Sequence, residues 1–236
     1  MLSDKRGERV RWPVFLGLAL LGVHMLSTPV WVGAVDLGQA QESLAKVSSA
    51  DFGREKASSH AREVVDWIVA SQDHQGLPFV VVDKTQARVF VFNPQGRLQG
   101  AAPVLVGLTR GDEGVPGIGD RPLSLIRPFE RTTPAGRFSA SLDKNVSGQA
   151  ILWVDYEQGI SLHPVRSVDP KERRLERLAS SIAADHRISY GCINVPYSFW
   201  NQVVQPQFQN TVGVVYVLPD TKPLKSIFKG FPHNHH

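Results

Sequence analysis

The chain has 236 residues, of which 42% are hydrophobic and 20% are charged, so it is long enough for one sizeable core and is not composed like a disordered protein. Its formal net charge is +4, but without residues 1–34 the balance is only 22 Lys/Arg against 20 Asp/Glu. No basic run with interleaved aromatic residues occurs elsewhere, which argues against a nucleic-acid partner.

The N-terminal segment has the layout of a secretory signal. An apolar run over residues 12–21 follows four basic residues, Lys5, Arg6, Arg9 and Arg11. Val32-Gly33-Ala34 offers the small residues that a signal peptidase reads. We therefore expect residues 1–34 to be a signal peptide, so that the mature protein is exported to the periplasm or cell wall and meets the membrane only through this segment before cleavage. An uncleaved anchor over residues 12–34, just long enough to span a bilayer, is the alternative.

A linker and a helix are expected next, over residues 35–77. Residues 36–59 are small and polar without a sustained period, which is typical of a linker or a poorly ordered arm. Apolar residues from Ala61 to Val69 then recur with the period of a helix, which Ser58 or Ser59 would cap and Gly76 would end. The main domain is expected over residues 78–219, and residues 220–236 are expected to be a C-terminal tail.

The main domain has mostly the period of strands. Two β-branched and aromatic runs, residues 79–83 and 88–92, predict a β-hairpin. A glycine-rich loop over 109–123 is of the length that tends to be functional, and it lacks the Gly-Lys-Ser/Thr of a phosphate-binding loop. Further strands are expected at residues 103–108, 137–142, 149–155, 159–163 and 212–218.

Two helices are expected within this β-rich domain. The first spans residues 171–184 and carries Arg and Glu on its solvent side, with an apolar face made of Leu175, Leu178, Ala179 and Ile182. The second spans residues 196–204 and begins at Pro196. The pattern as a whole predicts a mainly β domain with inserted helices.

Cys192 is the only cysteine, so it forms no internal disulfide and is a candidate reactive thiol in an exported protein. It also lies too far from the N-terminus to be a lipoprotein anchor. A helix that begins soon after it would favour a thiolate, and the backbone N–H groups of Gly191 and Cys192 would face a developing oxyanion. The alternative is that Cys192 is a small buried apolar residue.

A thiol at its ordinary pKa needs a base, and His163 is the leading candidate. It ends a predicted strand, and the carbonyl of Pro164 is available to orient its imidazole. His186 is a rival base that is closer to Cys192 in sequence. Arg187 and Arg166 are candidate ligands of substrate carboxylates, although each is as readily explained as a solvated surface charge.

These residues resemble the catalytic domain of the L,D-transpeptidases (the YkuD family), whose pattern is a His, a spacer, Ser/Thr-His-Gly-Cys, a hydrophobic residue, and Asn or Arg. The matching positions are His163, Ser189, Gly191, Cys192, Ile193 and Asn194. Thr133-Pro134-Ala135-Gly136-Arg137-Phe138 resembles a further motif of the family, and the resemblance covers roughly residues 78–219.

The chain departs from the family pattern in two places. Tyr190 stands where the family usually has a second His, so no role for that residue carries over. Residues 171–184 lengthen the spacer between His163 and Cys192, and the sequence does not decide whether this insertion forms a flap over the site or decorates the edge of the domain.

The resemblance implies a mainly β fold, with β-sandwich-like mixed sheets and peripheral helices. It also implies a function: Cys192 would attack the bond between the diamino acid and D-Ala in a peptidoglycan tetrapeptide stem, release D-Ala, and pass the acyl group from a thioester to an acceptor. His163 would be the base, with Gly191, Ser189, Tyr190 and Asn194 as the oxyanion-binding or supporting residues.

Several points stay open or are excluded on sequence grounds. The acceptor is a stem peptide, a protein lysine or, for an L,D-carboxypeptidase, water. A wall-binding module without turnover is the non-enzymatic alternative. A sortase-like enzyme would need an Arg after the Cys, and residues 193–236 contain none. No cofactor or metal is expected, because Cys192, His163 and His186 lack the short spacings of structural zinc sites.

Overall fold

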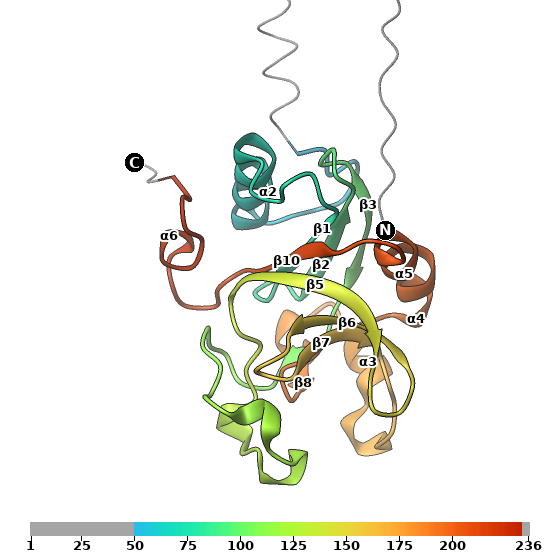
Figure 1. The fold of residues 1–236 in the computed structure, drawn as a ribbon. Helices are drawn as coiled ribbons and strands as arrows, with labels where there is room; N and C mark the ends of the chain where they lie inside the picture. The colour runs from blue at the N-terminus through green and yellow to red at the C-terminus, as the bar shows by residue number, and fades with distance from the viewer. Residues whose placement is uncertain (1–49, 233–236) are drawn as a thin grey trace, which may run out of the picture. The chain divides into compact units, whose positions relative to one another are not determined.

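An eight-stranded mixed sheet organises the computed structural model, which describes residues 50–232. The strand order is β3-β2-β1-β10-β5-β6-β7-β9, with parallel pairing for β1/β10 and β7/β9 and antiparallel pairing elsewhere (Figure 1). The strands are β1 (Phe79–Asp83), β2 (Arg88–Phe92), β3 (Leu98–Pro103), β5 (Gly136–Lys144), β6 (Ala150–Asp155), β7 (Ile160–Pro164), β9 (Ile193–Val195) and β10 (Gly213–Val217). The mainly β class with mixed sheets is therefore confirmed.

The sheet curls around the larger of two hydrophobic cores. Leu105, just beyond one edge strand, pairs with Asn194 of the other edge strand through two N–H···O bonds of 2.9 Å. A small parallel sheet of β4 (Val106–Gly107) and β8 (Arg187–Ser189) lies beside this junction. The continuous helical segment of α4 (Tyr197–Phe199), the π-helical turn η6 (Trp200–Val204) and α5 (Gln205–Phe208) packs four buried side chains into this core: Phe199, Trp200, Val204 and Phe208.

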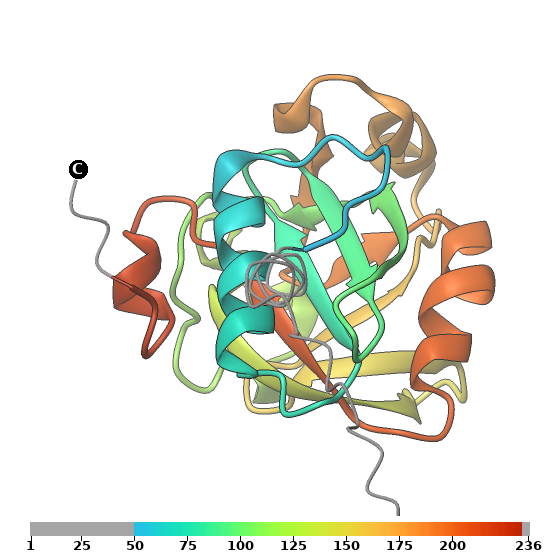
Figure 2. The same ribbon diagram turned by 90° about the horizontal axis from the view of Figure 1, so that it is seen from above.

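The second core covers the other face of β1, β2 and β10. Helix α2 (Ser59–Ser71) packs an apolar stripe there and lies across the sheet in Figure 2. Alternate residues of β1 face the two cores, Val80 toward the first and Val81 toward the second. Because both faces are covered, these strands are almost uninterrupted apolar runs.

The predicted hairpin, the strands at 137–142, 149–155, 159–163 and 212–218, and the helix from residue 61 to 69 are confirmed within a few residues. Ser58 caps α2 as expected, since its side chain accepts a hydrogen bond from the Ala61 N–H. The helix ends earlier than expected, at Ser71, because Gln72 takes the left-handed conformation.

Two predicted elements are wrong. Residues 103–108 do not form one strand: β3 ends at Pro103, and Val104 to Val106 are apolar because they are buried on all sides. The helix expected at 171–184 is only α3 (Arg174–Ala179), between the short turns η4 (Pro170–Glu172) and η5 (Ala183–His186). Of its expected apolar face only Leu178 is buried, while Leu175 and Ile182 are exposed.

Segments expected to flank the domain also pack on it. Phe52, from the end of the predicted linker, contacts Phe90 and Phe92 edge to face at centroid distances of 5.2 Å. Residues 220–232, assigned above to a tail, include α6 (Leu224–Ile227) and bury Leu224 and Phe228. The predicted glycine-rich loop is confirmed, extends to residue 135 and carries the short turns η1 (Ile118–Asp120), η2 (Leu123–Leu125) and η3 (Pro128–Glu130).

The predicted signal peptide, most of the linker and residues 233–236 lie outside the described residues. Over residues 50–232, no helix combines the length and apolar character needed to cross a membrane.

Candidate active site

The candidate site lies where β7 and β9 pair in parallel. Leu162 is opposite Ile193, and both side chains enter the larger core. Side chains alternate along a strand, so Ser161, His163, Cys192 and Asn194 project from the other face of this pair. His163 is paired with Asn194, and Cys192 lies two residues before Asn194, directly before β9 begins.

The thiol of Cys192 is partly exposed and contacts neighbouring residues of the same face. Its Sγ lies 3.7 Å from Ser161 Oγ and donates a hydrogen bond of 3.6 Å to the Gly159 carbonyl. Over the described residues these are its hydrogen-bond partners, and His163 is not among them. His163 is a diagonal neighbour of Cys192, a relationship that a rotation of the cysteine side chain can convert into contact.

The helix expected at residues 196–204 is confirmed, with Pro196 as its N-cap, but it does not begin directly behind Cys192. Cys192 is followed by β9, and the helical segment begins only at Tyr197. A helix dipole acts within its first turn and therefore does not reach the thiol. Of the two N–H groups expected to face an oxyanion, that of Gly191 donates to Ser189 Oγ at 3.1 Å in this structure.

Gly191 is required by the tight packing of the loop before Cys192. Its φ is +133°, and a Cβ there would lie 2.6 Å from Ile160 Cδ1 and 2.8 Å from the Thr132 carbonyl oxygen. The Ser189 hydroxyl donates to the Cys192 carbonyl at 2.7 Å, and the Thr133 hydroxyl donates to the Gly191 carbonyl at 2.7 Å. Ser189 and Thr133 thus hold the peptide groups on both sides of the thiol.

His163 is positioned by its own strand. Its Nδ1 lies 2.8 Å from the Pro164 carbonyl, the contact that the sequence suggested, and its Nε2 lies 3.3 Å from Asn194 Nδ2. Burial lowers the pKa of His163 to about 4; the charges of Arg166 and Arg174 act in the same direction, and the Pro164 carbonyl acts against it. The imidazole is therefore neutral at pH 7, the form that accepts a proton.

Asn194 connects this histidine to the insertion. Its side chain is fully buried, and its Oδ1 accepts a 2.5 Å hydrogen bond from Arg174 Nη1 of α3. Arg174 also contacts Glu172 Oε2 at 2.5 Å. Sequence analysis missed Arg174, although the Arg/Glu-rich insertion between His163 and Cys192 was a signal.

Tyr190, at the position of the family histidine, packs against another residue that sequence analysis missed. The guanidinium carbon of Arg131 lies 3.8 Å from the centroid of the Tyr190 ring. This distance is well inside the range of a cation–π interaction. No sequence pattern joins these two residues, since Arg131 belongs to the end of the long loop.

The remaining candidates lie apart from the thiol. His186 is buried with Nδ1 2.9 Å from the Val104 carbonyl and Nε2 3.0 Å from the Ser180 carbonyl, so both ring nitrogens are engaged. Arg187 forms a buried ion pair with Asp220 at 2.5 Å and contacts three backbone carbonyls. These contacts describe structural roles, and neither residue enters the function proposed below.

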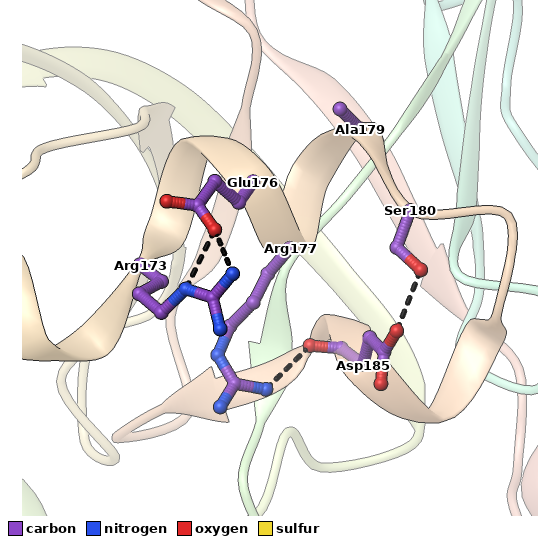
Figure 3. Close-up of a pocket in the computed structure, with 6 residues that line it drawn as sticks. All are labelled: Arg173, Glu176, Arg177, Ala179, Ser180 and Asp185. Atoms are coloured by element: carbon purple, nitrogen blue, oxygen red, sulfur yellow. Dashed lines mark hydrogen bonds and ion pairs between the residues drawn. The ribbon is translucent and has the colours of Figure 1, made fainter.

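Two cavities lie near the site without including the thiol. One of about 380 Å³ is in the insertion, where Figure 3 shows Arg173 paired with Glu176, and Arg177 and Ser180 directed at Asp185. The other, of about 320 Å³, is lined by residues that include Arg166, Pro164 and Tyr197. Cys192 and His163 line neither cavity. Among residues 50–232 no group of three or more His, Cys, Asp or Glu side chains is arranged to hold a metal ion.

Comparison by sequence finds no matching family model and no matching curated protein. By structure, the chain is similar to the helical cell shape determining protein Pgp2 from Campylobacter jejuni, with a TM-score of 0.40 and 15% identity over 62% of this chain and 48% of that one. It is also similar to an L,D-transpeptidase from Xylanimonas cellulosilytica, with a TM-score of 0.37 and 15% identity over 60% of each chain.

A third similar structure is an L,D-transpeptidase from Mycobacterium tuberculosis, with a TM-score of 0.37 and 16% identity over 60% of this chain and 57% of that one. The chain thus spans less than two thirds of the length of each of these three proteins. Most of the solved structures that it resembles are L,D-transpeptidases.

Proposed function

We propose that this protein is an exported L,D-transpeptidase-like cysteine acyltransferase of the peptidoglycan, with Cys192 as nucleophile and His163 as base. The observation that carries the proposal is the shared strand face of a lone thiol and a partly buried, neutral imidazole whose Nδ1 is held by the Pro164 carbonyl. A neutral imidazole held in this way directs its second nitrogen toward the face that carries the thiol. A base beside a thiol activates it as a nucleophile by accepting its proton.

The reaction would begin when the Cys192 side chain turns from the Gly159 carbonyl toward His163. The thiol proton passes to Nε2 as Sγ attacks the carbonyl carbon of the diamino acid–D-Ala bond. When the tetrahedral intermediate collapses, the C–N bond breaks, the imidazolium returns the proton to the leaving amine, and D-Ala departs. The acyl group stays on Cys192 as a thioester until an amine or water attacks it and restores the thiol.

A wall-binding module without turnover is the second candidate. Two observations favour it: the thiol contacts Gly159 and Ser161 rather than His163, and Tyr190 replaces the family histidine. Such a module has no need of an activated thiol, so chemistry at Cys192 separates the two functions.

The test is incubation of the mature protein with a tetrapeptide muropeptide, with D-Ala and the protein mass measured together. We expect D-Ala release and an acyl adduct on Cys192, little reaction with a pentapeptide, and covalent addition of a carbapenem at the same residue. His163→Ala should remove most turnover, whereas His60→Ala, an exposed histidine of α2, should leave it unchanged. Cys192→Ser should also lose most turnover. Absence of an adduct with every tetrapeptide donor would leave the binding module as the function.

A further inference from the structure

The insertion between His163 and Cys192 sends one side chain into the candidate site. Arg174 belongs to α3, and its side chain is only 13% exposed. Its Nη1 donates to Asn194 Oδ1 at 2.5 Å, and the Asn194 amide nitrogen in turn faces His163 Nε2 at 3.3 Å. The three residues form one chain of contacts that ends at the Pro164 carbonyl, 2.8 Å from His163 Nδ1.

The order of donors in this chain follows from the chemistry of arginine. A guanidinium has donors only and stays charged, so the atom of Asn194 that faces Arg174 must be its carbonyl oxygen. The amide NH₂ then faces His163, and Nε2 must accept. With Nε2 as acceptor, the imidazole proton resides on Nδ1, where the Pro164 carbonyl accepts it.

The opposite amide orientation is unfavourable for two reasons. It would turn the Asn194 NH₂ toward Arg174, placing donor against donor. It would also set carbonyl oxygens against both nitrogens of His163, which satisfies both only if the ring is an imidazolium. Burial and the charges of Arg166 and Arg174 disfavour that form.

We infer that Arg174 is a positioning residue of the insertion, which fixes the Asn194 amide and so keeps the His163 proton on Nδ1 and the lone pair on Nε2. The catalytic consequence rests on the function proposed above, while the hydrogen-bond order does not. The Asn194 NH₂ divides its two hydrogens between His163 Nε2 and the Cys192 carbonyl, at 3.3 and 3.4 Å. Both contacts are long, so the thiol can displace the amide from Nε2.

Hydrogen bonds within the insertion hold α3, and with it Arg174, in a fixed position. The Arg177 side chain donates to the Glu172 carbonyl and, at the same distance of 2.9 Å, to the Asp185 carbonyl. The Ser180 hydroxyl donates to the Asp185 carboxylate at 2.6 Å, and Figure 3 shows the contacts of Arg177 and Ser180 with Asp185. These bonds tie both ends of α3 together, and Leu178 is buried beneath it. The insertion is thus a fixed part of the site rather than decoration of its edge.

The charged and titratable groups that face His163 come from three elements. Arg166 follows β7, Arg174 lies on α3 with Glu172 as its partner, and Cys192 precedes β9. Loss of Arg174 removes a cation from His163 and also frees the amide of Asn194. Both changes should increase the population of protonated Nε2.

The experiment reads the protonation of His163 directly, from two-bond ¹H–¹⁵N spectra of the ¹⁵N-histidine-labelled mature protein at pH 7. The His163 signals are assigned with His163→Gln. Wild type should show a protonated Nδ1 and an unprotonated Nε2. Arg174→Ala should shift His163 toward protonated Nε2, and Arg174→Lys, which keeps a donor-only cation, should restore part of the wild-type pattern. Arg173→Ala is the matched control, because Arg173 pairs with Glu176 on the surface and does not contact Asn194.

A second variant keeps the test decisive if Arg174→Ala unfolds. Asn194→Asp offers oxygens to both Arg174 and His163, so His163 should gain a proton on Nε2. The rate of Cys192 modification by a thiol reagent should fall about tenfold in Arg174→Ala and stay at the wild-type value in Arg173→Ala. A wild-type pattern of His163 in both Arg174→Ala and Asn194→Asp would overturn the inference.

The two proposals fail differently. If D-Ala is never released but the His163 pattern responds to Arg174, the positioning role stands and the enzymatic function does not. If D-Ala is released and the pattern ignores Arg174, the positioning role fails and the enzymatic function stands.

Discussion

His163 and His186 show how the same side chain takes different roles from its neighbours. His163 has one nitrogen at a carbonyl and the other at an amide NH₂, so Nδ1 carries the proton, which the Pro164 carbonyl accepts, and Nε2 carries a lone pair. His186 has a carbonyl oxygen at each nitrogen and joins the insertion to the strand region near Val104. Only the first arrangement suits a general base.

The low pKa of His163 makes stability depend on pH. In the unfolded chain the imidazole binds a proton below about pH 6.5, whereas in the folded protein it does so only below about pH 4. Unfolding therefore takes up a proton in this range, and the free energy of unfolding falls as the pH drops from 6.5 to 4.

We expect wild type to lose about 3 kcal/mol more of its unfolding free energy than His163→Gln between pH 7 and pH 4. Urea unfolding of both proteins at the two pH values measures the difference, and the comparison cancels the contributions of other groups. An equal loss in both proteins would mean that His163 is not held neutral.

At the scale of elements, the loop before Cys192 depends on the end of the glycine-rich loop. Thr133 is buried, and its hydroxyl accepts from the Gly107 N–H at 2.8 Å while donating to the Gly191 carbonyl at 2.7 Å. A single hydroxyl thus joins β4, the 131–133 segment and the peptide before the thiol. The Thr-Pro-x-Gly-x-Phe stretch of the sequence carries this contact.

Thr133→Val keeps the shape of the side chain but leaves a buried N–H and a buried carbonyl without their partner. We expect the free energy of unfolding to fall by about 1–3 kcal/mol, together with slower modification of Cys192. Thr109→Val is the control, because the Thr109 hydroxyl bonds to Pro128 in an exposed position and should change stability by no more than about 0.5 kcal/mol. Thermal and urea unfolding measure both, and equal effects would remove Thr133 from this role.

At the scale of the whole molecule, a buried ion cluster ties the N-terminal hairpin to the loop and to the C-terminal segment. Lys84, directly after β1, has a fully buried ammonium within 3.1 Å of Asp112 and 3.5 Å of Asp220, and it donates to the Thr133 carbonyl at 2.8 Å. Burial lowers the pKa of Lys84, and the two carboxylates offset part of this shift. Asp220 also pairs with Arg187, so every charge has a partner.

Lys84→Met removes the ammonium and leaves two buried carboxylates that repel each other. We expect a loss of about 3–5 kcal/mol in unfolding free energy, as is usual when one partner of a buried pair is deleted. Lys225→Met on the exposed side of α6 should change it by no more than about 0.5 kcal/mol. Urea denaturation followed by circular dichroism tests this, and a loss below 1 kcal/mol for Lys84→Met would contradict it.

Local patterns in the sequence were enough to predict much of this fold. The 3.6-residue period of α2, the apolar strands β1, β2 and β10, and the mainly β class follow from short-range regularities, because helix and strand periods repeat within a few residues. The thiol, the histidine and the Pro164 carbonyl were also recognisable from sequence. The single strand expected at 103–108 is instead the end of β3, a bridge from Leu105 to Asn194 and the short strand β4, because a fully buried apolar run does not reveal where its pairing partner changes.

Only the tertiary structure decided how the site is assembled. Arg174 reaches Asn194, Arg131 packs against Tyr190, Thr133 holds Gly191, and strand β9 separates Cys192 from the helix that begins at Tyr197. Residues 50–58 and 220–232 also pack on the domain through contacts between distant segments. Phe52 contacts the aromatic ring of Phe90, and Phe228 contacts that of Tyr216. By itself the sequence determined the residue types and the period of the elements, whereas contacts between distant segments depend on three-dimensional packing, which no local period encodes.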